Sequence, residues 1–212
     1  MTPKFAAHAT AMETAGWTVL RNTWSDKLLQ RLATMDRLVP NFKLVREAYD
    51  GLPMRVAEEI TGELVFSKAS VGVAAGWFRT RVDTIASGAP VGFVPGVCIA
   101  GPTTDAGAQL SVIPGSARLG VAVTVPQQLA IGVTLAQGDA AILDSRAMRR
   151  WSPAESVFQL SVVRPWIEPE HDAAGLVAAD TPPRAARFAG VAGRPAESLE
   201  SWLFERHERR SS

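Results

Sequence analysis

The sequence predicts a mainly β fold, a two-sheet jelly roll with helices in front of it. From Leu64 onward, short runs rich in valine and isoleucine are separated by glycine, proline and aspartate, which is typical of a β-sandwich or barrel. Several of these runs alternate apolar and polar side chains, as strands do when one face of a sheet is buried. Before Leu64 the apolar residues recur at helical spacing instead. These observations place a helical layer at the N-terminus and the sheets after it.

The N-terminal elements follow from local signals. Residues 3–15 are expected to form a short helix, because Gly16 follows them and glycine commonly lies just past a helix end. Residues 17–21 are expected to form a short strand. Ser25 is a good N-cap for an amphipathic helix of about fourteen residues. Its apolar face is made by Leu28, Leu29, Leu32, Met35, Leu38 and Val39. A further helix is expected over residues 53–61, within a stretch of mixed pattern.

Nine short runs are the candidate strands of the two sheets. They read ELVFS, SVGVAA, WFRTRVDTI, VGFVPGVCIAG, QLSVIPG, VAVTVP, IGVTLAQ, AAILDS and FQLSVVRPW. Within QLSVIPG the pair Pro114-Gly115 marks a turn after the strand.

The domain organisation is expected to be simple. Residues 1–167 form one domain, because 212 residues with 47% apolar side chains suit a single core. Residues 168–194 are rich in Pro, Ala, Gly, Asp and Arg without periodicity, which predicts a surface linker. Residues 195–212 predict a C-terminal helical tail with an apolar face made by Leu199, Trp202 and Leu203. This face either docks on its own domain or forms a homodimer.

Charge and cysteine content exclude several classes of function. The net charge is +1, from 22 basic and 21 acidic side chains, which argues against a nucleic-acid or membrane-surface partner. Cys98 is the only cysteine and is expected to be a small core residue. No disulfide can form within one chain, so a reducing cytoplasm is expected. No stretch has the length and apolarity of a signal peptide or a membrane span.

Three stretches of the sequence carry a family resemblance. Residues 109–120 read QLSVIPGSARLG, residues 137–153 read QGDAAILDSRAMRRWSP, and residues 160–166 read LSVVRPW. In this order they resemble the phytanoyl-CoA dioxygenase-like family of the iron(II)/2-oxoglutarate oxygenases. The resemblance implies a double-stranded β-helix, which is a cupin-like jelly roll, with an N-terminal helical layer. It covers residues 12–167.

The chain departs from this family where the cofactors would bind. Arg149 stands at the place of the family's distal iron-binding histidine. The best match to the first ligand pair puts Arg81 in place of a histidine and leaves Asp83 as the carboxylate. Ala117 replaces the histidine of the family's PGSH phrase, and Gln159 replaces the arginine that binds 2-oxoglutarate. The resemblance therefore implies a degenerate member without the two-histidine, one-carboxylate triad.

The histidine content supports the loss of the metal. The chain has only His8, His171 and His207, and none of them begins an H-x-D or H-x-E triplet. A non-haem iron site needs two imidazoles and one carboxylate. Two guanidiniums beside one carboxylate would repel a dication. We therefore expect no metal and no cofactor.

The remaining side chains predict a cationic and aromatic barrel interior. A regular strand would put Trp77, Arg79, Arg81 and Asp83 on one face, and the stretch from Asp144 onward is expected to be the facing strand. The expected catalytic residues are Arg81, Asp83 and Arg149. The expected substrate-binding residues are Trp77, Arg79, Arg146, Trp151 and Gln159. The alternative is that Arg81–Asp83 and Asp144–Arg146 are structural ion pairs.

Three functions follow from this site. The leading hypothesis is a metal-independent enzyme, a cyclase, isomerase or lyase acting on a small oxygenated natural-product intermediate, because fixed guanidiniums can stabilise developing negative charge. The second is a non-catalytic binding or scaffold protein. The third is an iron(II)/2-oxoglutarate oxygenase with unusual ligands. An enzyme should have a solvent-accessible pocket containing Arg81, Asp83 and Arg149, whereas a scaffold could have its interior filled by Trp and Leu.

Overall fold

The computed structural model describes most of the predicted domain and a short part of the segment after it. The described residues are 5–34, 42–79, 94–119, 126–165 and 181–190, together with Ile167, Ala173, Gly175 and Val177. The expected C-terminal helix over residues 195–212 lies outside them, as do Arg81 and Asp83.

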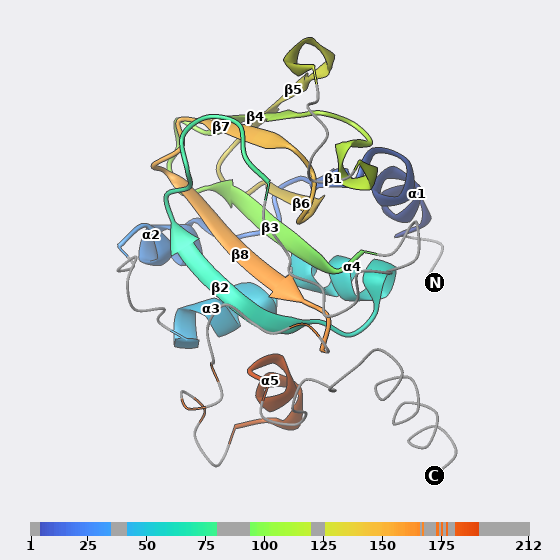
Figure 1. Cartoon of the computed structure of the whole chain (residues 1–212). Coiled ribbons are helices and arrows are strands. Elements are labelled where there is room, and N and C mark those ends of the chain that lie inside the picture. The colour runs from blue at the N-terminus through green and yellow to red at the C-terminus, as the bar shows by residue number, and fades with distance from the viewer. Residues whose placement is uncertain are drawn as a thin grey trace, which may run out of the picture.

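Two antiparallel sheets form the body of the protein (Figure 1). The larger sheet has the strand order β1-β6-β3-β8-β2, formed by β1 (Trp17–Leu20), β6 (Ala140–Asp144), β3 (Gly96–Pro102), β8 (Val157–Val163) and β2 (Val65–Val71). The smaller sheet has the order β5-β4-β7, formed by β5 (Ile131–Leu135), β4 (Ala108–Val112) and β7 (Arg149–Ser152). Two short 3-10 turns, Ser116–Arg118 and Gln127–Leu129, lie between strands. The mainly β jelly roll predicted from the sequence is confirmed.

The larger sheet separates two apolar cores. Along β3, Val97 and Ile99 belong to the core shared with the helices, whereas Cys98 and Ala100 belong to the core between the two sheets. Successive side chains of a strand point to opposite faces, so a strand buried on both faces reads as a continuous apolar run. Every residue of β3 is buried, which explains its run GVCIAGP.

Four helices cover the outer face of the larger sheet (Figure 1). They are α1 (Ala6–Ala15), α2 (Asp26–Ala33), α3 (Phe42–Tyr49) and α4 (Leu52–Thr61). Helix α1 ends at Gly16 with a φ of 82°, in the left-handed conformation that glycine adopts readily. The Ser25 hydroxyl accepts a hydrogen bond from the backbone N–H of Leu28 at 3.3 Å, which confirms the predicted N-cap of α2.

Two helices differ from the sequence prediction. Helix α2 has eight residues and ends before Thr34, whose hydroxyl donates to the Arg31 carbonyl at 2.9 Å. Such a local hydrogen bond competes with continuation of the helix. Helix α3 was not predicted, although its sequence FKLVREAY is amphipathic. It is stabilised by tertiary packing, since Val45, Ala48 and Tyr49 are buried in the core under the sheet.

The strand pattern is corrected at the stretch after Asp144. The sequence predicts one alternating strand there, but β6 ends at Asp144 and β7 begins only at Arg149. The Asp144 carboxylate accepts the backbone N–H of Arg146 at 2.9 Å, and the Asp144 carbonyl accepts that of Ala147 at 2.8 Å. Aspartate forms such turns readily because its short side chain bonds the backbone two residues on.

Part of the expected surface linker is packed into the core. Residues Pro183–Phe188 form helix α5, and Phe188 is 1% exposed. Its ring stacks on Tyr49 of α3, with the ring centroids 3.9 Å apart. Within the described part of the chain, no helix is long and apolar enough to cross a membrane.

Candidate functional site

Arg149, which the family resemblance aligns with the distal histidine, is fully buried. It is the first residue of β7, and its neighbours in the interior are Phe78, Cys98 and Trp151. Its Nη1 donates to the carbonyls of Ser145 and Ala147, both at 3.1 Å. Its Cζ lies 4.6 Å from the centroid of the Phe78 ring. Carbonyl acceptors and an aromatic face stabilise a guanidinium that has been removed from water.

Cys98 lies beside this guanidinium, on β3. Burial raises the pKa of the Cys98 thiol, and the nearby charge of Arg149 and its hydrogen bond lower that pKa in part. The thiol is fully buried, so the expected role of Cys98 as a core residue is confirmed.

Gln159 and Trp151 bring polar atoms into the space between the sheets. Gln159 lies on β8 opposite Ala100, a residue of the inter-sheet core, and its Nε2 donates to the Ser161 hydroxyl at 3.2 Å. Within the described residues, Gln159 Oε1 and Trp151 Nε1 have no hydrogen-bond partner. Buried polar atoms normally have partners. An acceptor and a donor of this kind are suited to holding a small polar molecule.

Asp144 and Arg146 form a two-pronged ion pair. Arg146 Nε donates to Asp144 Oδ1 at 3.1 Å, and Arg146 Nη2 donates to Oδ2 at 2.8 Å. The Asp144 side chain is 4% exposed and that of Arg146 is 31% exposed. The structural ion pair considered as an alternative for these two residues is therefore present.

Trp77 and Arg79 do not join Arg149. Residues 77–79 are not part of a regular strand, and Phe78 makes a single bridge to Arg149. Phe78 therefore faces the interior, while Trp77 stacks on the exposed Arg150, with 5.3 Å from its ring centroid to the guanidinium carbon. Arg79 Nη1 donates to the Leu119 carbonyl at 3.3 Å. For Trp77 and Arg79 the expected inward orientation is wrong, because residues 77–79 do not form a regular strand, and their neighbour Phe78 faces the interior instead. Arg81 and Asp83, the other two residues of the expected stripe, lie outside the described residues.

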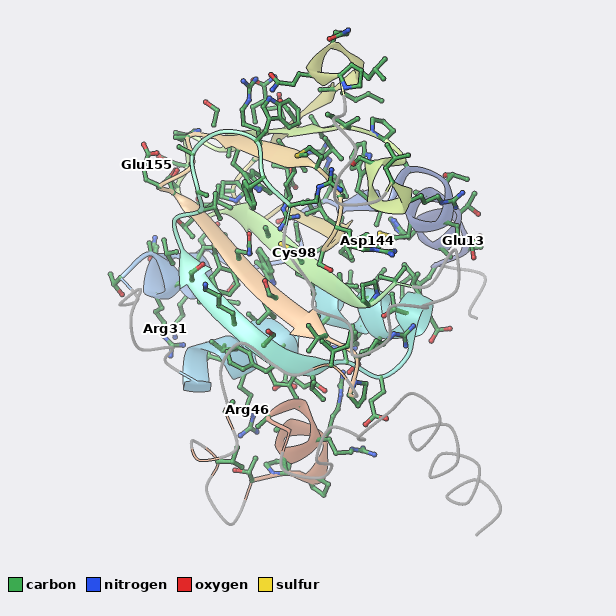
Figure 2. The ribbon with its side chains drawn as sticks, in the orientation of Figure 1. Glu13, Arg31, Arg46, Cys98, Asp144 and Glu155 are labelled. Carbon is green, nitrogen blue, oxygen red and sulfur yellow. The ribbon has the colours of Figure 1, made fainter. Side chains whose placement is uncertain are left out.

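A cavity of about 380 Å³ lies next to the turn between β6 and β7, on the side of that turn facing away from Arg149. Its walls come from α1, α4, the 3-10 turn at Ser116–Arg118, the end of β6 and the chain just after β8. Figure 2 shows Glu13 on α1 and Asp144 at the end of β6, which both line it. Of the expected substrate-binding residues, Arg146 lines this cavity.

The described residues do not fit an iron centre of the kind the resemblance implies. Arg149 is a buried cation at the position that the resemblance assigns to a histidine ligand. No three His, Cys, Asp or Glu side chains within the described ranges are grouped as metal ligands. His8 Nδ1 is 2.9 Å from the Thr18 hydroxyl, and His171 and His207 lie outside the described residues.

Comparisons of sequence find no match. No protein-family model matches the chain, and no curated protein sequence does.

Comparisons of structure find proteins of the same fold. The chain is similar to ThoJ, a non-heme monooxygenase in its apo form, with a TM-score of 0.55 and 12% identity over 77% of this chain and 80% of that chain. It is similar to SnoN, a non-heme alpha-ketoglutarate-dependent epimerase from nogalamycin biosynthesis, with a TM-score of 0.56 and 12% identity over 79% and 84%. It is also similar to AviO1 from Streptomyces viridochromogenes Tue57, with a TM-score of 0.55 and 16% identity over 80% and 99%. At these identities the likeness shows the fold, the jelly roll of non-heme oxygenases.

Proposed function

We propose that this chain is a metal-independent enzyme on an oxygenase fold, which converts a small oxygenated molecule by cyclisation, isomerisation or elimination. The observation that carries the proposal is the buried guanidinium of Arg149, at the position that the family resemblance aligns with the distal iron-binding histidine. A side chain that keeps its positive charge cannot replace a histidine in binding a dication, but it can stabilise an anion.

The chemistry expected in the barrel needs no oxidant. In an isomerisation, the Asp83 carboxylate would take a proton from a carbon beside a carbonyl, and the electron pair would move onto the carbonyl oxygen. The positive charges of Arg149 and Arg81 would stabilise that oxyanion. In a substrate with a carbon–carbon double bond one carbon further on, the carbonyl would re-form, the double bond would move by one position, and the proton held by Asp83 would bond to the far carbon of the original double bond. Arg81 and Asp83 lie outside the described residues, so their place in this scheme rests on the sequence.

The substrate would be held by the polar atoms between the sheets. Gln159 Oε1 would accept a hydrogen bond from a hydroxyl group, and Trp151 Nε1 would donate one to a carbonyl or hydroxyl oxygen. The similarity to SnoN, an epimerase from a natural-product pathway, supports a substrate of natural-product type. That likeness is one of fold, and the substrate class is our inference.

A non-catalytic binding or scaffold protein is the second candidate. Two observations favour it: Arg149 Nη1 already donates to two backbone carbonyls, and Trp151 and Leu110 occupy the space between the sheets. In that case Arg149 would hold the turn before β7 and would touch no substrate.

Metal analysis and an EDTA experiment separate the candidates. We expect the purified protein to carry far less than one iron per chain. We also expect it to convert one component of a metabolite mixture, and mass spectrometry measures this conversion. Cyclisation or isomerisation gives a product of the same mass as the substrate, and elimination gives two products whose masses add up to it. EDTA should leave this conversion unchanged. Asp83→Asn and Arg149→Ala should each lower it by at least about tenfold.

Arg150→Ala is the matched control, because Arg150 is the next residue of β7 and is exposed. It should leave the conversion unchanged. Since Arg149→Ala could also unfold the protein, Asp83→Asn and a thermal-unfolding measurement keep the test decisive. Conversion that EDTA abolishes, or turnover of 2-oxoglutarate, would establish the oxygenase alternative. Full conversion by both variants would remove the proposed site.

A further inference from the structure

We infer that the cavity beside helix α1 is a binding site for a small organic molecule that carries a carboxylate group. The cavity has a volume of about 380 Å³, which is within the range of small-molecule sites. Three arginines line it, Arg118, Arg146 and Arg164, together with the carboxylates of Glu13 and Asp144. This site lies outside the barrel interior, and the inference stands whether or not the barrel is catalytic.

The walls of the cavity are tied together by hydrogen bonds. The backbone N–H of Gly115 donates to the Ala15 carbonyl at 3.0 Å, and that of Asp144 donates to the Gly16 carbonyl at 2.8 Å. The Ser116 hydroxyl accepts the backbone N–H of Met148 at 2.8 Å. The end of α1, the turn after β4 and the end of β6 are therefore fixed to one another. A preformed site binds small ligands better, because less ordering is required on binding.

The charges of the lining favour an anion. The bidentate contact of Arg146 with Asp144 neutralises that carboxylate within the wall. Among the other described lining residues, the charged side chains are two arginines, Arg118 and Arg164, and one glutamate, Glu13. Arg118 and Glu13 are exposed and therefore mark its solvent side.

A glycine makes room for Arg164 at the cavity wall. Gly62 follows helix α4 with a φ of 86°, and a Cβ atom there would lie 2.9 Å from Arg164 Nη1. Arg164 Nε donates to the Val94 carbonyl at 3.1 Å, and the Arg164 backbone N–H donates to the Pro95 carbonyl at 3.0 Å. Backbone and side chain together hold the guanidinium in place, as a binding residue requires.

The rest of the lining defines the body of the ligand. Met12, Ile60, Val94 and Ala117 are apolar and line the same cavity as the arginines. A guanidinium matches a carboxylate better than a neutral group, because two parallel N–H donors face two oxygens. We therefore expect a ligand with one carboxylate and a small apolar part.

The turn between β6 and β7 separates this cavity from the barrel. On the inner side, the Ser145 and Ala147 carbonyls accept from Arg149. On the outer side, Asp144 and Arg146 line the cavity. Variants of Arg118 and Arg164 can therefore test the cavity without removing a residue of the barrel interior.

The test measures binding of benzoate and hexanoate to the full chain, each against its neutral amide, by calorimetry or ligand-observed NMR. Dissociation constants on the order of millimolar are expected for ligands of this size. The amides should bind at least about tenfold more weakly, because they lack the charge. Arg118→Gln and Arg164→Gln should each weaken carboxylate binding by about five- to tenfold.

Arg150→Gln is the control, since Arg150 is an exposed arginine that does not line the cavity. It should leave binding unchanged, and Arg118→Gln should leave the melting temperature nearly unchanged because Arg118 is exposed. Equal binding of acid and amide would overturn the inference, as would unchanged binding by Arg118→Gln and Arg164→Gln. If inorganic phosphate binds as tightly as benzoate, the site is a general anion site and the organic carboxylate is the wrong ligand.

Discussion

At the scale of single residues, the surroundings of Tyr49 change its ionisation. Its hydroxyl donates to Glu58 Oε1 at 3.2 Å and accepts from Arg184 Nε at 3.2 Å. The ring of Phe188 stacks on it. Burial, and next the negative charge of Glu58, raise the pKa of Tyr49 to about 12, against the opposing effect of Arg184.

The titration of Tyr49 is directly measurable, because it is the only tyrosine of the chain. We expect phenolate absorbance to appear near pH 12 in the folded protein and near the usual pKa of 10.0 in denaturant. The neutral phenol is the form favoured by folding. Its contribution to stability is therefore complete below pH 10 and is lost as the pH rises toward 12. Tyr49→Phe should remove the absorbance change altogether, and a folded-state midpoint near 10 would contradict the described contacts.

Arg149 is a buried charge whose contacts come from a turn. The sequence predicts that it faces the barrel interior with Trp151, and the structure confirms that both are buried. The carbonyls that accept hydrogen bonds from its Nη1, those of Ser145 and Ala147, belong to a turn. The sequence pattern predicts a continuous strand at this place. Its contacts therefore could not be predicted from strand alternation alone.

At the scale of elements, the carboxylate of Asp139 connects the turn before β6 to the chain after β1 by hydrogen bonds. Asp139 accepts hydrogen bonds from the backbone N–H groups of Asn22 and Ala136, both at 2.9 Å, and from Arg21 Nη1 at 2.6 Å. Burial alone would raise the pKa of Asp139, but these hydrogen bonds outweigh it and lower the pKa below its usual value. The aspartate of the GD phrase is thus a structural residue.

Asp139→Asn should destabilise the protein near neutral pH by about 1.5–3 kcal/mol, because a charged acceptor is lost from a buried site. The Arg21 side chain is 59% exposed, so most of this loss should come from the two backbone hydrogen bonds. A lowered pKa contributes stability above the usual value of 3.8, and this contribution is lost as the pH falls through the folded-state pKa. The difference between the two proteins in denaturant unfolding should therefore shrink in acid.

The control for this prediction is Asp105→Asn, since Asp105 is an exposed aspartate in the loop before β4. It should change the free energy of unfolding by less than about 0.5 kcal/mol. An equal effect of both substitutions, or an Asp139→Asn effect that does not depend on pH, would contradict the assigned role.

At the scale of the whole molecule, we propose that association depends on the C-terminal segment, residues 195–212, which lies outside the described residues. The sequence gives it an apolar helical face made by Leu199, Trp202 and Leu203. We predict that the full chain is a dimer by light scattering and that Trp202→Ala shifts it toward the monomer, because a large buried aromatic is lost. Ser201→Ala, on the opposite helical face, should leave the dimer intact. A monomeric wild-type chain would contradict the predicted dimer.

Local patterns were sufficient for the fold class. The alternation of side chains in the strands, the Ser25 N-cap and the glycine after α1 depend on neighbours in the chain, and each is present as expected. The motif order also led to the jelly roll that the solved structures share. Helix α3 and helix α5 were not predicted, because their stability comes from burying Tyr49 and Phe188 against distant parts of the chain.

The sequence by itself determined which side chains stand where the family resemblance puts its cofactor-binding residues, because a motif fixes residue identity. They are an arginine at 149, in place of an iron-binding histidine, and a glutamine at 159, in place of the arginine that binds 2-oxoglutarate. Only the tertiary structure decided what these groups contact. It placed Phe78 against the interior, bonded Arg149 to two carbonyls of the turn that precedes it, and assembled the arginine-lined cavity from segments more than a hundred residues apart. The physical reason is that a cavity and a buried charge are stabilised by contacts between distant segments, and a local sequence pattern does not specify those contacts.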